Sequence, residues 1–123
     1  MTPRARNTLP ATAGHSPLGE LGFQILVALG EGAAHGYAIG KQVEARTGGR
    51  LEPTTGTLYQ ALRRLLADGL IRPVTPSRAV DTDPRRKSFA ITPAGKRAVA
   101  EEARRLEAMV QAARDSKLYP ASS

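Results

Sequence analysis

The side chains best equipped to hydrogen-bond with another molecule lie in one stretch, TTGTLYQALRRLLADGLI, at residues 54–71. At a helical period of 3.6 residues, its apolar face consists of Leu58, Leu62, Leu65 and Leu66, and its polar face of Gly56, Gln60, Arg63 and Arg64. The amide of Gln60 and the guanidinium of Arg63 can each form paired hydrogen bonds with the edge of a nucleic-acid base. Because any surface helix can carry a basic outer face, this stretch alone favours an ordinary solvated face.

Three threonines open the same stretch: Thr54, Thr55 and Thr57. Their hydroxyls, together with the free amides of a helix N-terminus, predict phosphate contacts that fix the helix on a polyanion. Capping of the helix is at least as good a role for Thr54 or Thr55. The threonines therefore carry two interpretations, one functional and one structural.

Positive charge is concentrated in the second half of the chain. The 123 residues have a formal net charge of +7, with 18 Lys and Arg against 11 Asp and Glu. Between Arg50 and Arg97, ten basic and four acidic residues supply +6 of that total. The run Arg85, Arg86 and Lys87 is placed to contact phosphates or a minor groove. We therefore expect a polyanionic partner, either nucleic acid or an anionic membrane surface.

Composition excludes several classes of protein. The absence of cysteine excludes disulfides, thiolate metal sites and cysteine nucleophiles. No apolar run reaches the roughly 18 residues that a membrane-spanning helix needs, so we expect a soluble, cytoplasmic protein with no membrane span. The sequence offers neither a nucleophile paired with a base nor a metal-binding cluster, and we therefore expect no enzymatic activity and no cofactor.

Hydrophobic periodicity and capping signals predict the elements that position these residues. Helices are expected at 18–29, 36–46, 53–69 and 93–115, and strands at 70–75 and 85–92. Thr92 and Pro93 are the capping and first residues of the last helix, and His35 is assigned a structural role in satisfying backbone groups at a helix start. This order predicts a mainly α fold with a small β wing, a winged helix-turn-helix followed by a long C-terminal helix. The predicted organisation is a disordered basic arm at 1–17, a winged helix-turn-helix domain at 18–92, a dimerisation helix at 93–115 and a disordered tail at 116–123.

The last predicted helix carries an apolar repeat of its own. The spacings are 4, 3, 4 and 3 residues, at Val99, Ala103, Leu106, Val110 and Ala113. Such a heptad seam is typical of a helix that packs against a partner helix. We expect a homodimer held by this seam, with help from Phe23 and Val27 of the first helix. The alternative is that the helix packs on the first helix of its own chain.

Several motifs in order resemble the PadR family of bacterial transcriptional regulators. They are His35-Gly36-Tyr37, Gly56-Thr57-Leu58-Tyr59, Gly69-Leu70-Ile71, and Ile91-Thr92 with Gly95. The resemblance covers roughly residues 18–113 and implies a homodimer that represses promoters. It also implies that the Tyr59 hydroxyl meets the DNA backbone, the alternative being a half-buried core ring. The predicted DNA contacts are Thr54, Thr55, Thr57, Tyr59, Gln60, Arg63, Arg64, Arg85, Arg86 and Lys87.

The resemblance leaves two matters open. Some relatives bind planar aromatic effectors between the subunits by stacking on tryptophan, and this chain has no tryptophan. The identity of any small aromatic or hydrophobic effector is therefore undetermined. A basic winged-helix module that binds protein or RNA without operator specificity is the alternative function.

Overall fold

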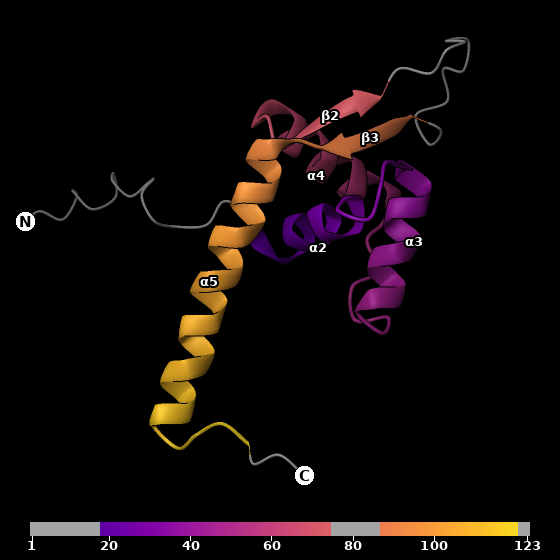
Figure 1. Ribbon diagram of the computed structural model, residues 1–123. Helices are drawn as coiled ribbons and strands as arrows, with labels where there is room; N and C mark the ends of the chain where they lie inside the picture. The colour runs from indigo at the N-terminus through magenta and orange to yellow at the C-terminus, as the bar shows by residue number, and fades with distance from the viewer. Residues whose placement is uncertain (1–17, 75–86, 121–123) are drawn as a thin grey trace, which may run out of the picture.

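The computed structural model describes residues 18–74 and 87–120 (Figure 1). Its helices are α2 at Gly19–Leu29, α3 at Gly36–Arg46, α4 at Thr55–Ala67 and α5 at Pro93–Asp115. Its strands are β1 at Ala34–His35, β2 at Ile71–Val74 and β3 at Ser88–Ile91. This mainly helical arrangement with a small antiparallel sheet confirms the predicted fold class.

The core lies where α2, α3 and α4 meet beneath the sheet. Its members are Leu18, Ile25, Leu26, Leu29, Ile39, Val43, Leu58, Leu62, Leu65, Ile71 and Phe89. The leucine face predicted for α4 is confirmed for Leu58, Leu62 and Leu65, whereas Leu66 is only partly buried. Each fully buried aliphatic side chain contributes about 1.5–3 kcal/mol relative to exposure. The opposite face of α4 is therefore held at the surface by the burial of its leucines.

The sheet contains a strand that the sequence did not predict. Its order is β1-β3-β2, with Ala34 opposite Phe89 and His35 opposite Ser88. The His35 Nδ1 atom lies 3.0 Å from the Ser88 hydroxyl oxygen. The structural role expected for His35 thus includes a hydrogen bond to a side chain of the wing, and not only to backbone groups at the helix start.

Capping side chains fix where α5 begins, as predicted. The Thr92 hydroxyl accepts a hydrogen bond from the Gly95 N–H at 3.0 Å and donates one to the Gly69 carbonyl at 2.7 Å. A Cβ atom at Gly95 would overlap the Leu70 carbonyl oxygen, so glycine is required there. Thr92 and Gly95 therefore join α5 to the segment between α4 and β2.

The first half of α5 packs on α2 and β3, and the second half projects beyond the rest of the described fold (Figure 1). After Asp115 the chain turns: the Leu118 N–H donates to the Ala113 carbonyl at 2.9 Å, and Lys117 has a φ of 62°. The tail predicted to be disordered from residue 116 therefore begins as an ordered capping turn. The predicted arm at 1–17 and residues 121–123 lie outside the described residues.

Residues 18–74 and 87–120 contain no helix that is both long enough and apolar enough to cross a bilayer.

The buried face of α4 yields a stability prediction. Leu62 is 1% exposed, so Leu62→Ala leaves a cavity beneath α4 and should lower the free energy of unfolding by about 2–5 kcal/mol. Urea titration followed by circular dichroism measures the change. Leu118→Ala is the matched control, because Leu118 is 79% exposed and its truncation should cost less than about 0.5 kcal/mol. Equal costs for the two variants would contradict the placement of Leu62 in the core.

Candidate nucleic-acid interface

The exposed face of α4 carries three of the predicted contact residues, Gln60, Arg63 and Arg64. Thr54, Thr55 and Thr57 are also exposed, at the N-terminal end of the same helix. The segment 55–67 contains no Asp or Glu, so a polyanion approaching α4 meets two guanidinium groups and no carboxylate along the helix itself. All six residues are therefore accessible, either on α4 or at its start.

The threonines at the start of α4 have different roles. Thr54 caps the helix, since its hydroxyl oxygen accepts a hydrogen bond from the Thr57 N–H at 3.1 Å. The hydroxyls of Thr54 and Thr57 lie 3.0 Å apart and share one hydrogen bond. Because two hydroxyls carry two protons and this contact uses one, the pair keeps one proton that could be donated to a phosphate. The capping interpretation thus holds for Thr54, and Thr55 takes no part in the cap.

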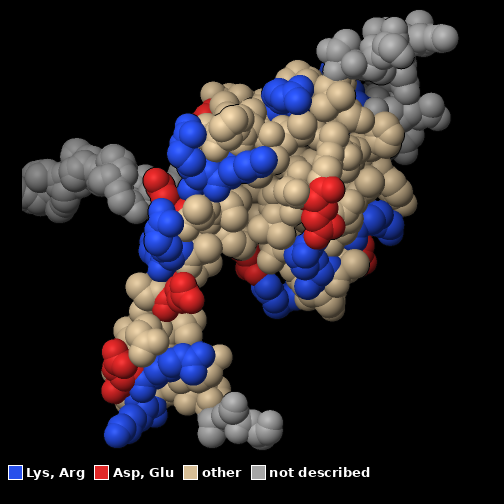
Figure 2. Space-filling view, viewed as in Figure 1, with Lys and Arg blue, Asp and Glu red and all other residues tan. Residues whose placement is uncertain are grey.

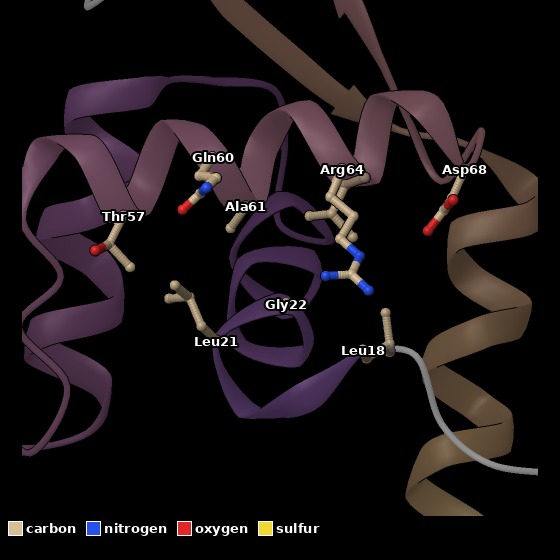
Figure 3. Close-up of a pocket in the computed structure, with 9 residues that line it drawn as sticks. Leu18, Leu21, Gly22, Thr57, Gln60, Ala61, Arg64 and Asp68 are labelled. Carbon is tan, nitrogen blue, oxygen red and sulfur yellow. The ribbon is translucent and has the colours of Figure 1, made fainter.

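A hollow of about 430 Å³ separates α4 from the beginning of α2 (Figure 3). Its walls are Leu18, Leu21 and Gly22 on one side and Thr57, Gln60, Ala61, Arg64, Leu65 and Asp68 on the other. Figure 3 shows the Arg64 guanidinium reaching across this α2–α4 hollow toward Leu18. Gln60 and Arg64 therefore border the hollow, and Arg63 is not among its lining residues.

Tyr59 is a packing residue that connects α4 to α3. It is partly buried against the core, and a Cβ atom at Gly36 would overlap its hydroxyl and ring carbons. The Gly36 N–H in turn donates to the Lys87 carbonyl at 3.2 Å. Only a residue without a side chain fits between the Tyr59 ring and the wing, which explains the glycine of the His35-Gly36-Tyr37 motif.

The basic run of the wing is only partly described. Lys87 is exposed at the start of β3, beside the strand that carries the wing back to the core. Arg85 and Arg86 lie outside the described residues, as does the predicted loop at 76–84. Figure 2 shows further Lys and Arg side chains grouped around the first turns of α5, whereas both signs of charge alternate along its projecting half.

Two exposed residues of α3 were missed by the sequence analysis. Tyr37 is 59% exposed, and the Lys41 ammonium lies 5.8 Å from the centroid of its ring. Both line a hollow of about 170 Å³ that also reaches Pro53 and Thr55 at the start of α4. The signal available in the sequence was their spacing, because residues four positions apart on a predicted helix lie side by side.

Arg50 does not belong to this surface, although the sequence analysis counted it in the basic cluster. Its Nη1 atom donates to Glu20 Oε1 at 3.0 Å, and its Nη2 atom pairs with Oε2. The hydrogen bonds from Arg50 hold the pKa of the Glu20 carboxyl below its ordinary value. The stabilising effect of this pair is therefore present at neutral pH and is lost as the pH falls through the lowered pKa.

The predicted dimerisation seam divides into a packed part and an exposed part. Val99 is partly buried against the core of its own chain, which is the alternative that the sequence left open for this helix. The remainder of the seam is Ala103, Leu106 and Val110, with Met109 beside them and Ala113 partly covered. Leu106 and Val110 are each 38% exposed, and Met109 is 56% exposed. The projecting half of α5 thus presents an uncovered apolar stripe.

Phe23 and Val27 are the two α2 residues predicted to assist the seam. Both are partly buried. Phe23 and Leu106 line a hollow of about 440 Å³ between α2 and α5, together with Gln24, Glu102 and Arg105. Glu102 is 9% exposed and accepts hydrogen bonds from Arg105 at 3.0 and 2.5 Å. Of the predicted seam residues, the structure thus brings Phe23 of α2 and Leu106 of α5 to the same hollow.

The three short helices α2, α3 and α4, followed by a small antiparallel sheet, define a winged helix-turn-helix protein. One of these helices, α4, turns a polar face outward. The family of PadR-like transcriptional regulators matches residues 25–101, and the chain belongs to this family. It is therefore a transcriptional regulator and not an enzyme.

Similar proteins agree with this assignment. The transcriptional regulator Rv3488 of Mycobacterium tuberculosis is 38% identical over 72% of this chain and 78% of its own length. An uncharacterized 37.1 kDa protein in transposon Tn4556 of Streptomyces fradiae is 42% identical over 64% of this chain, but that match covers only 21% of its length. The structure of Bacillus subtilis PadR in complex with operator DNA has a TM-score of 0.58 at 24% identity, over 71% of this chain and 48% of that one. This last likeness shows the fold.

The contact between Tyr59 and Gly36 yields the second prediction. Gly36→Ala should lower the free energy of unfolding by about 1–3 kcal/mol, because the added methyl overlaps the tyrosine ring. Gly56→Ala is the matched control: nothing lies near a Cβ atom there, and alanine should stabilise α4 by about 0.5–1 kcal/mol. Replacing Tyr59 by leucine in the Gly36→Ala background should recover part of the loss. If the changes in unfolding free energy of the two single variants simply add in the double variant, as measured by thermal unfolding, the ring and residue 36 are not in contact.

Proposed function

We propose that this regulator is a cytoplasmic homodimer that represses transcription by binding a palindromic promoter site in double-stranded DNA. The observation that carries the proposal is the exposed face of α4, where Gln60, Arg63 and Arg64 stand opposite a buried leucine face. In a winged helix-turn-helix protein this helix enters the major groove. Its side chains then meet the base edges, which carry the sequence information.

The proposed contacts differ in what they recognise. Gln60 can pair with adenine and Arg63 with guanine, since both groups form two hydrogen bonds in one plane. Thr57, Arg64 and Lys87 contact phosphates, as do Arg85 and Arg86 of the wing, and these contacts set the position of the helix on the duplex. The Tyr59 hydroxyl is proposed to meet the DNA backbone from its place beside Gly36.

The second copy is proposed to cover the apolar stripe of α5. Leu106, Met109 and Val110 form an exposed patch at helical spacing, which is rare in a monomer and typical of an interface. Two recognition helices held about 34 Å apart then read successive major grooves. Dimerisation and operator binding are therefore coupled in this proposal.

Relief of repression is proposed to involve the hollow between α2 and α5. It has the size of a small-molecule site and is lined by Phe23 and Leu106. The Oε1 atom of Gln24, which also borders it, is buried without a hydrogen-bond partner among the described residues. A small aromatic or hydrophobic effector with one donor group would satisfy this atom, and its binding would alter the spacing of the two recognition helices.

Base reading by α4 is tested with a duplex selected from a random-sequence library by the full chain. Gln60→Ala or Arg63→Ala should weaken binding to this operator by about 1–3 kcal/mol more than binding to unselected DNA, measured by fluorescence anisotropy at fixed salt. Arg104→Ala, on the projecting half of α5, is the control for loss of one charge. Equal losses on both duplexes would limit these residues to phosphate contacts. Equal affinity for duplex RNA and selected DNA would favour the RNA-binding alternative.

The dimer is tested with Glu at both Leu106 and Val110. Like charges buried at an interface are strongly destabilising, so the variant should sediment as a monomer and lose operator binding while its circular dichroism is retained. The matched control places Glu at Arg104 and Gln111, two exposed positions of α5 outside the seam, and should remain dimeric. A dimeric Leu106→Glu, Val110→Glu variant would show that the dimer is built elsewhere.

A further inference from the structure

The hollow between α2 and α5 is acidic, although the chain as a whole is basic. Its lining among the described residues includes two carboxylates, Glu20 and Glu102, and one guanidinium, Arg105. Glu20 is paired with Arg50, which lies outside this lining. Glu102 is 9% exposed, so its carboxylate is largely withdrawn from bulk water. The charged groups that border the hollow are therefore mainly of the sign opposite to the net charge of +7.

The hydrogen-bond donors of Arg105 are already engaged within the protein. Its Nε atom donates to Glu102 Oε1 at 3.0 Å, and its Nη2 atom donates to Oε2 at 2.5 Å. Its Nη1 atom donates to the sulfur atom of Met109 at 3.4 Å. Because every nitrogen atom of the guanidinium has a protein acceptor, Arg105 is poorly placed to bind an anion in the hollow.

The acceptors of the same lining keep capacity for a ligand. Gln24 Oε1 is buried without a hydrogen-bond partner among the described residues. A buried acceptor without a partner is costly, so a ligand that donates to it gains affinity. A carboxylate offers about four lone-pair sites, so Glu102 can accept a hydrogen bond from a ligand beside those from Arg105. The polar part of the hollow therefore calls for a donor with positive charge.

Apolar side chains supply the rest of the lining. Phe23 is partly buried on α2, and Leu106 is 38% exposed on α5. The face of an aromatic ring attracts a cation, which adds to the attraction of the carboxylates. Apolar walls with a few polar groups are typical of small-molecule sites, and a volume of about 440 Å³ is sufficient for one.

We propose that the hollow between α2 and α5 binds a lipophilic ammonium ion, an organic amine with an apolar body. The ammonium group donates to Gln24 Oε1 and to the Glu102 carboxylate beside the Phe23 ring, and the apolar body packs against Leu106. Simple amines have a pKa of about 10, as lysine does, and are charged at neutral pH. The inference rests on the proposed relief of repression for its regulatory meaning, and it names the class of effector.

Three probes with one apolar body test the required charge: phenylpropylamine, phenylpropanol and phenylpropionate. Each is titrated by calorimetry into the full chain at neutral pH without DNA. The amine should bind about tenfold more tightly than the alcohol, because a charge-assisted hydrogen bond is about twice as strong as a neutral one. The carboxylate should bind most weakly, since Glu102 repels it. Equal affinities, or tightest binding of the carboxylate, would overturn the proposal.

Two variants locate the bound amine. Glu102→Gln should abolish the preference for the amine over the alcohol, because it removes the charge and keeps the shape. Gln24→Leu should weaken both ligands by roughly threefold to tenfold through loss of one acceptor. Glu107→Gln is the matched control: Glu107 is an exposed residue of α5 outside the lining, and its replacement should change neither affinity.

Glu102 is buried, so its variant is first checked for folding by circular dichroism. If Glu102→Gln does not fold, Phe23→Leu takes its place: it keeps an apolar wall, removes the ring face and should reduce the preference for the amine. Unchanged affinities in Gln24→Leu and in whichever of the other two variants is folded would overturn the assignment of the site.

The outcomes separate the ligand class from the function on which it rests. Failure of the unaltered chain to select any duplex would overturn the proposed function, and tight binding of the amine would remain. Amine binding that leaves the affinity for the selected operator unchanged would overturn its role as an effector. Equal binding of the three probes, with Gln60→Ala still defective on the operator, would overturn the ligand class and leave the regulator intact.

Discussion

The burial of one leucine face of α4 is the constraint on which the rest of the structure depends. Leu58, Leu62 and Leu65 are each at most 5% exposed, packed against α2 and α3. Because a helix is rigid, fixing these three side chains also fixes the direction of the residues on the opposite face. Gln60 and Arg63 are exposed for this reason and need no specific contact to hold them outward. The same packing that stabilises the domain thus selects which residues can reach a partner.

Attachment of the wing depends on a second, smaller set of contacts. Gly36 lies between the Tyr59 ring and the Lys87 carbonyl, so it joins α4, α3 and β3 at one point. The hydrogen bond between His35 and Ser88 adds a contact one residue away. These contacts hold Lys87 and the start of β3 against α3 and α4. The phosphate contact proposed for Lys87 is therefore placed relative to the base-reading face proposed for α4.

Local signals in the sequence predict the helices well. Thr92 and Pro93 specify the start of α5 because a capping hydroxyl and a proline act within one turn of their own position. The two-residue strand β1 has no period of its own and forms only because β3 is available to pair with it. The Arg50–Glu20 ion pair joins residues thirty positions apart, and no local pattern marks it. Val99 likewise has the same apolar spacing in the sequence as the other seam residues of α5. Only the fold shows that Val99 packs against the core of its own chain.

The distribution of charge distinguishes a reading surface from general basicity. Arg50 and Arg46 are engaged by Glu20 and Glu31 within the domain, so part of the positive charge serves the fold. Along α4, in contrast, Arg63 and Arg64 have no carboxylate on the same helix to compete with a phosphate. Neutralisation of a polyanion gains most where cations are exposed and not already paired, because each such contact releases a counterion. The net charge of +7 is therefore less informative than the absence of acidic residues from α4, which would favour the approach of a polyanion to the helix that carries the proposed base-reading groups.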